Sequence, residues 1–154
     1  LPPTRTLDVA CGTAFITQHL RGDVVGLDQS PRMLEEAQQR LPRATFVQGD
    51  ALALPFPNAS FDRLFTSYFY CHLEHDDRER FLGEAHRVAG ELIVMASRPG
   101  DDDEPRERWD ERVLNDGSRW QVYKRVFEPD DLAAELHGEA IHAGRWFVLV
   151  RTVL

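Results

Sequence analysis

Short apolar runs alternate with amphipathic stretches along most of the chain. Buried strands are predicted by the apolar runs at residues 7–9, 24–27, 44–48, 63–67 and 91–97. Apolar residues at helical spacing predict helices at residues 15–20, 31–41 and 76–88. Because strands that alternate with helices form parallel sheets, this part of the chain predicts an α/β fold.

The remainder of the chain has a different pattern. Residues 98–108 are densely charged and predict a solvated linker, and residues 109–116 are a candidate for a short helix. Residues 119–127 alternate enough to predict a strand or extended arm, and Pro129 begins a further helix. Two strands at 139–142 and 146–153 form a closing hairpin. The predicted fold is a doubly wound, mostly parallel α/β sheet with an antiparallel C-terminal hairpin and helices on both faces.

Residues 7–20 carry the first chemical signal. A strand with Asp8 at its carboxyl end leads into a tight turn of small residues, which are Cys11, Gly12, Thr13 and Ala14. Small residues at such a bend let a ligand approach backbone N–H groups at the positive end of the helix that follows. The stretch therefore predicts a ligand site, or else an ordinary turn between a strand and a helix.

The turn does not fit a dinucleotide. A dinucleotide fingerprint needs three glycine positions, which here fall on Ala10, Gly12 and Phe15. Phenylalanine at the third position blocks the close packing of helix on strand. The Asp8 carboxylate would also repel a phosphate and attract a cation instead.

This stretch resembles motif I of the class I (Rossmann-like) S-adenosylmethionine-dependent methyltransferases, whose usual form is (D/E)-x-G-x-G-x-G. Residues 8–14 read DVACGTA, so alanine replaces two of the three glycines. S-adenosylmethionine carries a sulfonium and an ammonium and has no phosphate. The string LPF at 54–56 with FD at 61–62, and His72 followed by Leu73, are typical of the small-molecule (type 11/25) branch. The resemblance covers residues 7–97 and, less closely, 128–153, and it implies the sheet order 3-2-1-4-5-7-6.

Acids also end the second and third predicted strands. Asp28 follows Asp8 by about 20 residues, the spacing at which nucleotide-binding units place an acid on the ribose hydroxyls. The resemblance implies that Asp50 accepts from the adenine amino group, and Met33 either packs on the adenine or belongs to the core. The residues expected to bind the cofactor are Asp8, Ala10, Cys11, Gly12, Thr13, Asp28, Gln29, Met33, Asp50, Ala51, Leu52, Ser67 and Tyr68.

The acceptor side offers fewer signals. His72, with Tyr68 beside it, is the candidate general base for a hydroxyl or amine acceptor, or else makes a structural hydrogen bond. The aromatic residues Trp109, Trp120 and Tyr123 either line an acceptor pocket or pack the arm. No metal is expected, because residues 72–75 read HLEH rather than H-E-x-x-H.

Composition narrows the function classes further. The 154 residues predict one domain, and a net charge of −8 argues against general attraction to nucleic acid or anionic membranes. No apolar run approaches the roughly 20 residues of a membrane span. Cys11 and Cys71 make no disulfide framework, so a reducing cytoplasm is the expected location. The resemblance predicts methyl transfer by an SN2 reaction to a small-molecule acceptor, with S-adenosylmethionine as cofactor and S-adenosylhomocysteine as product.

Two alternatives remain at this point, a non-catalytic module that binds S-adenosylmethionine and a nicotinamide-dependent oxidoreductase. We expect residues 1–154 to form a single methyltransferase domain, as a monomer or a homodimer. Residues 98–127 correspond to the variable segment that builds the substrate side in this family. The chain starts LPP without Met and enters a strand at once, which predicts a missing N-terminal lid segment.

Overall fold

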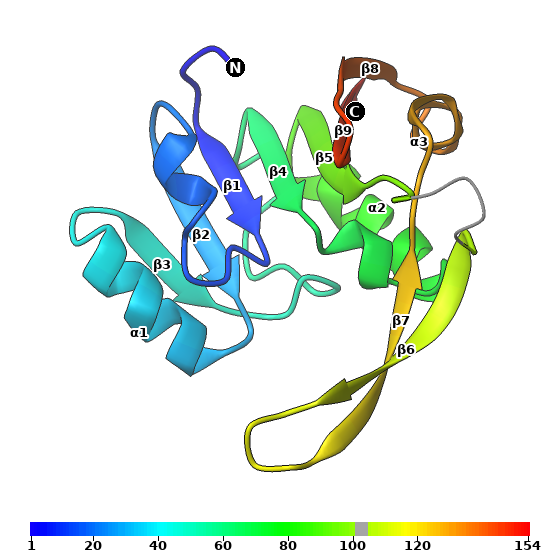
Figure 1. The fold of residues 1–154 in the computed structure, drawn as a ribbon. Coiled ribbons are helices and arrows are strands. Elements are labelled where there is room, and N and C mark those ends of the chain that lie inside the picture. Colours follow the sequence, from blue (N-terminus) through cyan, green and yellow to red (C-terminus); the bar gives the residue numbers. More distant parts are fainter. Residues whose placement is uncertain (101–104) are drawn as a thin grey trace.

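A seven-stranded sheet in the order β3-β2-β1-β4-β5-β9-β8 forms the centre of the computed structural model, which describes residues 1–100 and 105–154 (Figure 1). Its parallel strands are β1 (Thr6–Val9), β2 (Val24–Asp28), β3 (Thr45–Gln48), β4 (Arg63–Ser67) and β5 (Glu91–Ser97). The antiparallel hairpin β8 (Glu139–Ala143) and β9 (Phe147–Val153) joins the edge of β5. Counting the strands of this sheet alone gives 3-2-1-4-5-7-6, so the predicted fold and strand order are confirmed.

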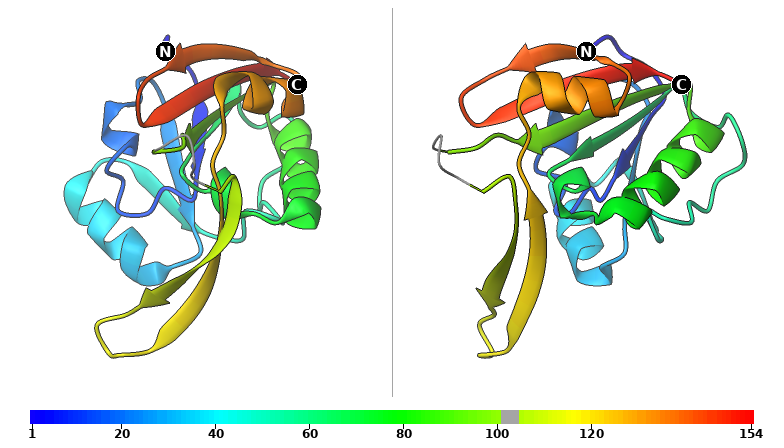
Figure 2. Two further views of the ribbon diagram at one scale, coloured as in Figure 1. Left: turned by 45° about the vertical axis from the view of Figure 1, so that its right-hand side comes forward. Right: turned by 90° about the vertical axis from the view of Figure 1, so that its right-hand side faces the viewer.

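Among the described residues three α-helices flank the sheet, with α1 (Pro31–Arg40) on one side and α2 (His75–Val88) on the other, near α3 (Pro129–Glu135) (Figure 2). Ser30 caps α1, since its side chain accepts from the backbone N–H of Met33, and Pro31 occupies the first helical position. The main core lies between the sheet and α2, where Phe81, Ala85 and Val88 are fully buried. A smaller cluster on the opposite face gathers around Phe65, Ile93 and Met95.

The helix predicted at residues 15–20 is wrong. In this segment the structure has a short 3-10 turn, η1 (Thr17–His19), in place of a helix. The backbone is left-handed both before and after this turn. Ala14 has φ 60° and Gly22 has φ 103°, and neither conformation continues a right-handed helix. Ile16 and Leu20 still pack on the smaller core, which accounts for their apolar spacing.

The helix predicted at residues 109–116 is also wrong, because this segment is a strand. β6 (Glu107–Val113) pairs antiparallel with β7 (Arg119–Arg125) in a separate two-stranded sheet. Cross-strand contacts stabilise the pair, including the Trp109 and Tyr123 rings and an ion pair from Arg119 to Glu111. We call residues 107–125 the arm. It extends past the carboxyl ends of the parallel strands (Figure 1), and residues 101–104 of the predicted linker lie outside the described part of the chain.

A buried network attaches the base of the arm to the domain. The carboxylate of Glu135 on α3 accepts from the Tyr70 hydroxyl at 2.8 Å and pairs with Arg125 of the arm at 2.8 Å. Arg78 of α2 lies 3.4 Å from the same carboxylate and 3.4 Å from the Tyr123 hydroxyl. The arm is therefore held at its base by both helices.

We predict opposite effects for alanine at two glycines. A Cβ at Gly26 would lie 2.6 Å from Phe46 Cδ1 and 2.9 Å from Cys11 Sγ, so Gly26→Ala should lower the free energy of unfolding by about 1–3 kcal/mol. Gly83, on the exposed face of α2, has no atom within 4 Å of such a Cβ, so Gly83→Ala should raise it by about 0.5–1 kcal/mol. Urea unfolding measures both, and an unaltered Gly26→Ala protein would contradict the packing described.

Candidate functional site

The turn after β1 is built on left-handed backbone. Ala10, Gly12 and Ala14 have φ 57°, 54° and 60°, and these are the three positions where the resembled motif has glycine. An alanine in this conformation is strained by about 1 kcal/mol. The glycine pattern is therefore a backbone requirement that this chain meets partly with alanine.

The Asp28 carboxylate holds this turn in place. One carboxylate oxygen accepts from the Gly12 N–H at 2.9 Å, and the other accepts from the Ser30 N–H at 2.9 Å. The Cys11 N–H also donates to the Leu27 carbonyl at 3.0 Å. Because a carboxylate has about four acceptor positions, the side chain retains capacity for a ligand.

A cavity of about 400 Å³ opens beside Asp28 at the carboxyl ends of β1, β2 and β3. This is within the range of small-molecule sites, roughly 300–1,000 Å³. Its wall includes six residues that the sequence singled out, which are Ala10, Asp28, Gln29, Asp50, Ala51 and Leu52. Four others were missed, Leu27, Gly49, Phe69 and Leu73. Leu27 and Gly49 adjoin the predicted acids Asp28 and Asp50, and Phe69 and Leu73 flank the segment Tyr70–His72. Their positions in the sequence were therefore the available signal.

The other expected cofactor residues lie outside this wall. Asp8 and Cys11 are buried beneath the turn, and Gly12 and Thr13 are half-buried within it. Met33 is 41% exposed on α1, which does not match a core position. Ser67 and Tyr68 lie at the end of β4, next to Phe69 of the cavity wall.

Asp8 is a fully buried carboxyl group on β1. One of its oxygens accepts from the Thr17 hydroxyl at 2.6 Å, whereas Oδ1 has no hydrogen-bond partner within the described residues. Burial raises the pKa of Asp8 to about 7, the Thr17 hydrogen bond opposes the rise, and the Asp28 charge adds to it. A cation bound near the turn would favour the charged form of Asp8.

The Cys11 thiol is chemically inert in this setting. Burial, followed by the charges of Asp8 and Asp28, raises its pKa to about 12. A thiol with this pKa is protonated at neutral pH and is a poor nucleophile. Cys11 therefore contributes to the packing of the turn.

The loop after β3 is fixed from two directions. The Asp50 carboxylate accepts from the Leu52 N–H at 2.8 Å, which closes a local turn under the cavity. Glu84 on α2 accepts from the Leu54 N–H at 2.6 Å, and Arg87 donates to the Leu54 carbonyl at 2.9 Å. The cavity wall at Ala51 and Leu52 is thus supported by α2.

Tyr68 and His72, which were expected on the acceptor side, follow β4. Tyr68 has φ 56°, a strained conformation of the kind that clusters at functional sites, and its N–H donates to the Met95 carbonyl at 2.8 Å. His72 Nδ1 lies 2.8 Å from the Tyr123 carbonyl of the arm. A carbonyl only accepts, so this contact places the proton on Nδ1 and leaves Nε2 as an acceptor.

The three aromatic residues expected on the acceptor side do not share one face of the arm. Trp109 and Tyr123 are directly paired, with ring centroids 5.7 Å apart. Trp120 pairs with Arg112 and lies on the opposite face, because successive residues of a strand alternate in direction. The Trp109 pair therefore faces the α2 side, where Tyr123 meets Arg78.

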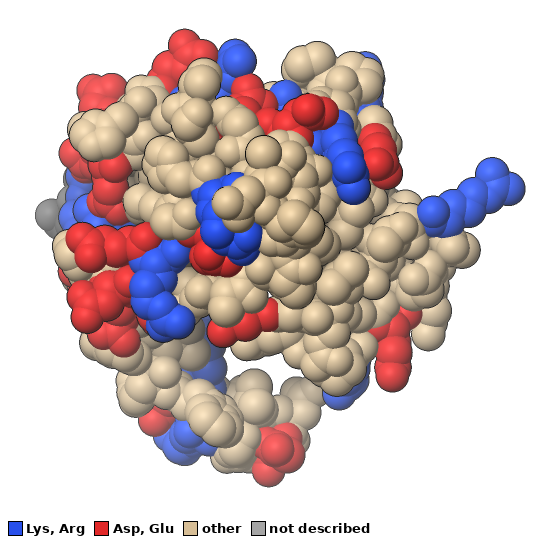
Figure 3. All heavy atoms as spheres, turned by 180° about the vertical axis from the view of Figure 1, so that it is seen from behind, with Lys and Arg blue, Asp and Glu red and all other residues tan. Residues whose placement is uncertain are grey.

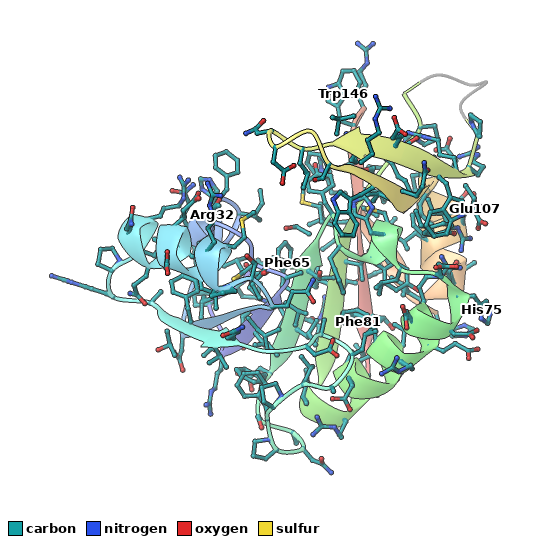
Figure 4. All side chains as sticks on the ribbon, turned by 90° about the horizontal axis from the view of Figure 1, so that it is seen from below. Arg32, Phe65, His75, Phe81, Glu107 and Trp146 are labelled. Carbon is teal, nitrogen blue, oxygen red and sulfur yellow. The ribbon has the colours of Figure 1, made fainter. Side chains whose placement is uncertain are left out.

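Figure 4 looks onto the carboxyl ends of the parallel strands. The helix α1 (labelled at Arg32), the helix α2 (His75 and Phe81) and the arm (Glu107) stand around this edge of the sheet. Within residues 1–100 and 105–154, no cluster of three or more His, Cys, Asp or Glu side chains has the arrangement of a metal site. The chemistry available here is binding and positioning by carboxylates, backbone amides and one imidazole.

Comparison with known sequences gives a consistent picture. Residues 7–91 match the methyltransferase-domain family. The demethylmenaquinone methyltransferase of Thermotoga maritima is 35% identical over 105 residues, which cover 63% of this chain and 45% of that protein. The demethylmenaquinone methyltransferase of Thermus thermophilus is 36% identical over 109 residues, covering 63% and 49%. The chain thus spans about half the length of these relatives.

Solved structures share the fold. The complex of DhpI with SAH superposes with a TM-score of 0.77 at 24% identity and covers 95% of this chain and 74% of that one. A SAM-dependent methyltransferase from Methanosarcina mazei gives a TM-score of 0.73 at 15% identity, covering 100% and 94%. At these identities the likeness establishes the fold.

We predict that Asp8 makes stability fall as the pH rises from about 4 to about 7. Its pKa is about 7 in the folded chain and about 3.9 when unfolded, so the folded state binds the extra proton in this window. In this window Asp8 lowers the free energy of unfolding by up to about 1.4 kcal/mol per pH unit, and Asp8→Asn should remove this dependence. Urea unfolding at pH 5 and pH 8 tests this, and parallel pH profiles for the two proteins would refute it.

Proposed function

The chain belongs to the methyltransferase-domain family, and from this premise we propose that it binds S-adenosylmethionine in the cavity beside Asp28 and transfers its methyl group to a small-molecule acceptor. The observation that carries the proposal is the left-handed turn, which Asp28 holds through the Gly12 N–H. Beneath it lies the buried carboxyl group of Asp8, one oxygen of which has no hydrogen-bond partner among the described residues. A turn of this kind brings backbone amides and negative charge together, which suits a ligand that is cationic and lacks phosphate.

The residues present fit this cofactor. The spare acceptor capacity of Asp28 suits the two ribose hydroxyls, and Asp50 with the apolar wall at Ala51 and Leu52 suits an adenine. The Oδ1 atom of Asp8 lacks a partner in the described residues. A bound ammonium and sulfonium would favour the charged form of this carboxyl group, which then supplies negative charge under the turn. The geometry of the turn and the cavity supports these residue roles.

The bound cofactor supplies a methyl carbon that its sulfonium already makes electrophilic. The work left to the chain is to align an acceptor atom with that carbon, at about 3–3.5 Å, and to exclude water. In this proposal the acceptor lies beside Tyr68, which directly follows β4 and has a strained φ of 56°. The arm, fixed by Glu135 and Arg78, provides the opposite boundary.

His72 is the general base in this proposal for an acceptor that must lose a proton. Its Nδ1–H is engaged by the Tyr123 carbonyl, so Nε2 is the free basic atom. The arm thereby sets the tautomer of the base. Residues 98–127 act as the substrate-side segment, and residues 1–154 as one methyltransferase domain.

No helix among the described residues has both the length and the apolar character needed to cross a bilayer. We propose the cytoplasm as the location and a monomer or homodimer as the assembly. The proposed location rests on the cysteine content given above.

We predict that Asp28→Ala weakens the binding of S-adenosylhomocysteine by about 1.5–3 kcal/mol, the range for a charged hydrogen bond. Part of this loss arises because the turn also loses its clamp at the Gly12 N–H. Calorimetric titration measures the affinity, with Glu36→Gln on the exposed face of α1 as control. A folded Asp28→Ala protein with wild-type affinity would exclude this cavity as the cofactor site.

Transfer itself is tested by incubating the protein with S-adenosylmethionine and fractionated small metabolites. The proposal predicts S-adenosylhomocysteine formation that depends on both the protein and one fraction, and that falls at least tenfold in Asp28→Ala. Binding without product in any fraction would favour the non-catalytic module instead.

A further inference from the structure

Lys124 is the only lysine in a chain whose other 17 basic residues are arginines, as counted along the sequence. It lies near the end of β7 and its side chain is half-buried. Within the part of the chain that the structure describes, its ammonium makes no hydrogen bond and no ion pair. The neighbouring Arg125 is paired with Glu107 and Glu135. The arm therefore contains one partly desolvated cation without a counter-ion.

The strand register shows which way Lys124 faces. Lys124 pairs with Arg108, and Trp120 pairs with Arg112, so these residues share one face of the arm. Tyr123 lies on the other face, the one that meets Arg78 of α2. Lys124 is thus directed away from the buried network that anchors the arm.

This face of the arm is positively charged in an acidic protein. Lys124, Arg108 and Arg112 lie on it together with one acid, Asp110, which pairs with Arg108 at 2.9 Å. The charges of Lys124 and Arg112 remain uncompensated by any described side chain, although the whole chain has a net charge of −8. A local excess of positive charge on this background attracts anions.

The base of the arm packs against the short turn η2 (Tyr70–His72). Lys124 directly follows Tyr123, whose backbone carbonyl lies 2.8 Å from His72 Nδ1. The charge of Lys124 acts on the Cys71 thiol and lowers the pKa of that group, against the larger raising effect of burial. The Cys71 thiol donates to the Tyr68 carbonyl at 3.1 Å, and the cavity wall includes Phe69 and Leu73 on either side. Figure 3 shows a hollow between the arm and the body of the domain. An acceptor placed at Tyr68 would therefore lie next to the segment against which the base of the arm packs.

We propose that Lys124 binds an anionic group of the methyl acceptor, so that the acceptors of this protein are small carboxylates or phosphates. A half-buried cation without a counter-ion is costly, and an anionic acceptor would offset that cost. The ammonium is a compact charge with three rotatable donors, so it accepts carboxylate and phosphate alike, whereas a guanidinium prefers planar, two-point contacts. Val122 and Trp120, on the same face, contact the apolar body of the acceptor. This inference rests on the proposed function.

The single lysine allows a direct test. Reductive methylation with ¹³C-formaldehyde labels Lys124 and the chain terminus only, and it preserves the positive charge. The labelled protein is first titrated calorimetrically with S-adenosylhomocysteine, and then by NMR with benzoate, phenyl phosphate and the uncharged analogue benzamide. We expect both anions to shift the Lys124 resonance and benzamide to leave it in place. The stronger of the two anions identifies carboxylate or phosphate as the preferred group.

Variants separate charge from general binding to the arm. Lys124→Met should weaken binding of the stronger anion about tenfold, the order expected for a charged hydrogen bond, while Lys124→Arg retains most of it. Arg119→Met is the matched control, because Arg119 lies on the opposite face and pairs with Glu111. It should change anion binding less than twofold.

Two results would overturn the inference while leaving the proposed function intact. One is normal S-adenosylhomocysteine binding with benzamide as effective as benzoate, or with no response to either anion. The other is a Lys124→Met protein that binds the anions as the unsubstituted protein does. Absence of S-adenosylhomocysteine binding would instead overturn the proposed function, and this inference with it.

Discussion

The hydrogen bonds of the Asp28 carboxylate hold the ligand-binding edge of this sheet together. They connect the turn after β1, through the Gly12 N–H, to the start of α1, through the Ser30 N–H. Two segments that are separate in sequence thereby acquire one fixed geometry at the mouth of the cavity. The same carboxylate retains acceptor capacity for a ligand, so structure and binding depend on one side chain. Removal of this carboxylate is expected to disturb both the turn and ligand binding. Folding and ligand affinity therefore have to be measured on the same variant.

Backbone strain is concentrated around the same edge. Ala10, Ala14 and Tyr68 all have positive φ, and each costs on the order of 1 kcal/mol relative to an unstrained residue. Such conformations persist only where the surroundings over-determine them, as Asp28 does for the turn. Alanine in place of glycine offsets part of the cost, because it reduces the conformational entropy of the unfolded chain. Alanine can therefore replace glycine at two positions of the motif while the turn is kept.

The sheet and much of the cavity could be predicted from the sequence, because buried strands and strand-end acids such as Asp28 and Asp50 leave local patterns. The helix predicted at residues 15–20 failed because the left-handed Ala14 is invisible to apolar spacing. Residues 119–127 were correctly predicted as a strand or extended arm. The helix predicted at residues 109–116 failed because that strand is stabilised by cross-strand partners such as Tyr123, which a local pattern does not contain. The sequence shows that Lys124 is the single lysine of this chain, but only the fold shows that it has no partner among the described residues.

The central claim is that the clamped turn and its cavity form a site for S-adenosylmethionine rather than for a nicotinamide cofactor. The most direct measurement is calorimetric titration of the unmodified chain with S-adenosylhomocysteine and, separately, with NADH. The account predicts saturable one-to-one binding of S-adenosylhomocysteine in the micromolar range and no measurable heat from NADH. Tighter binding of NADH, or no binding of S-adenosylhomocysteine to the folded chain, would contradict it.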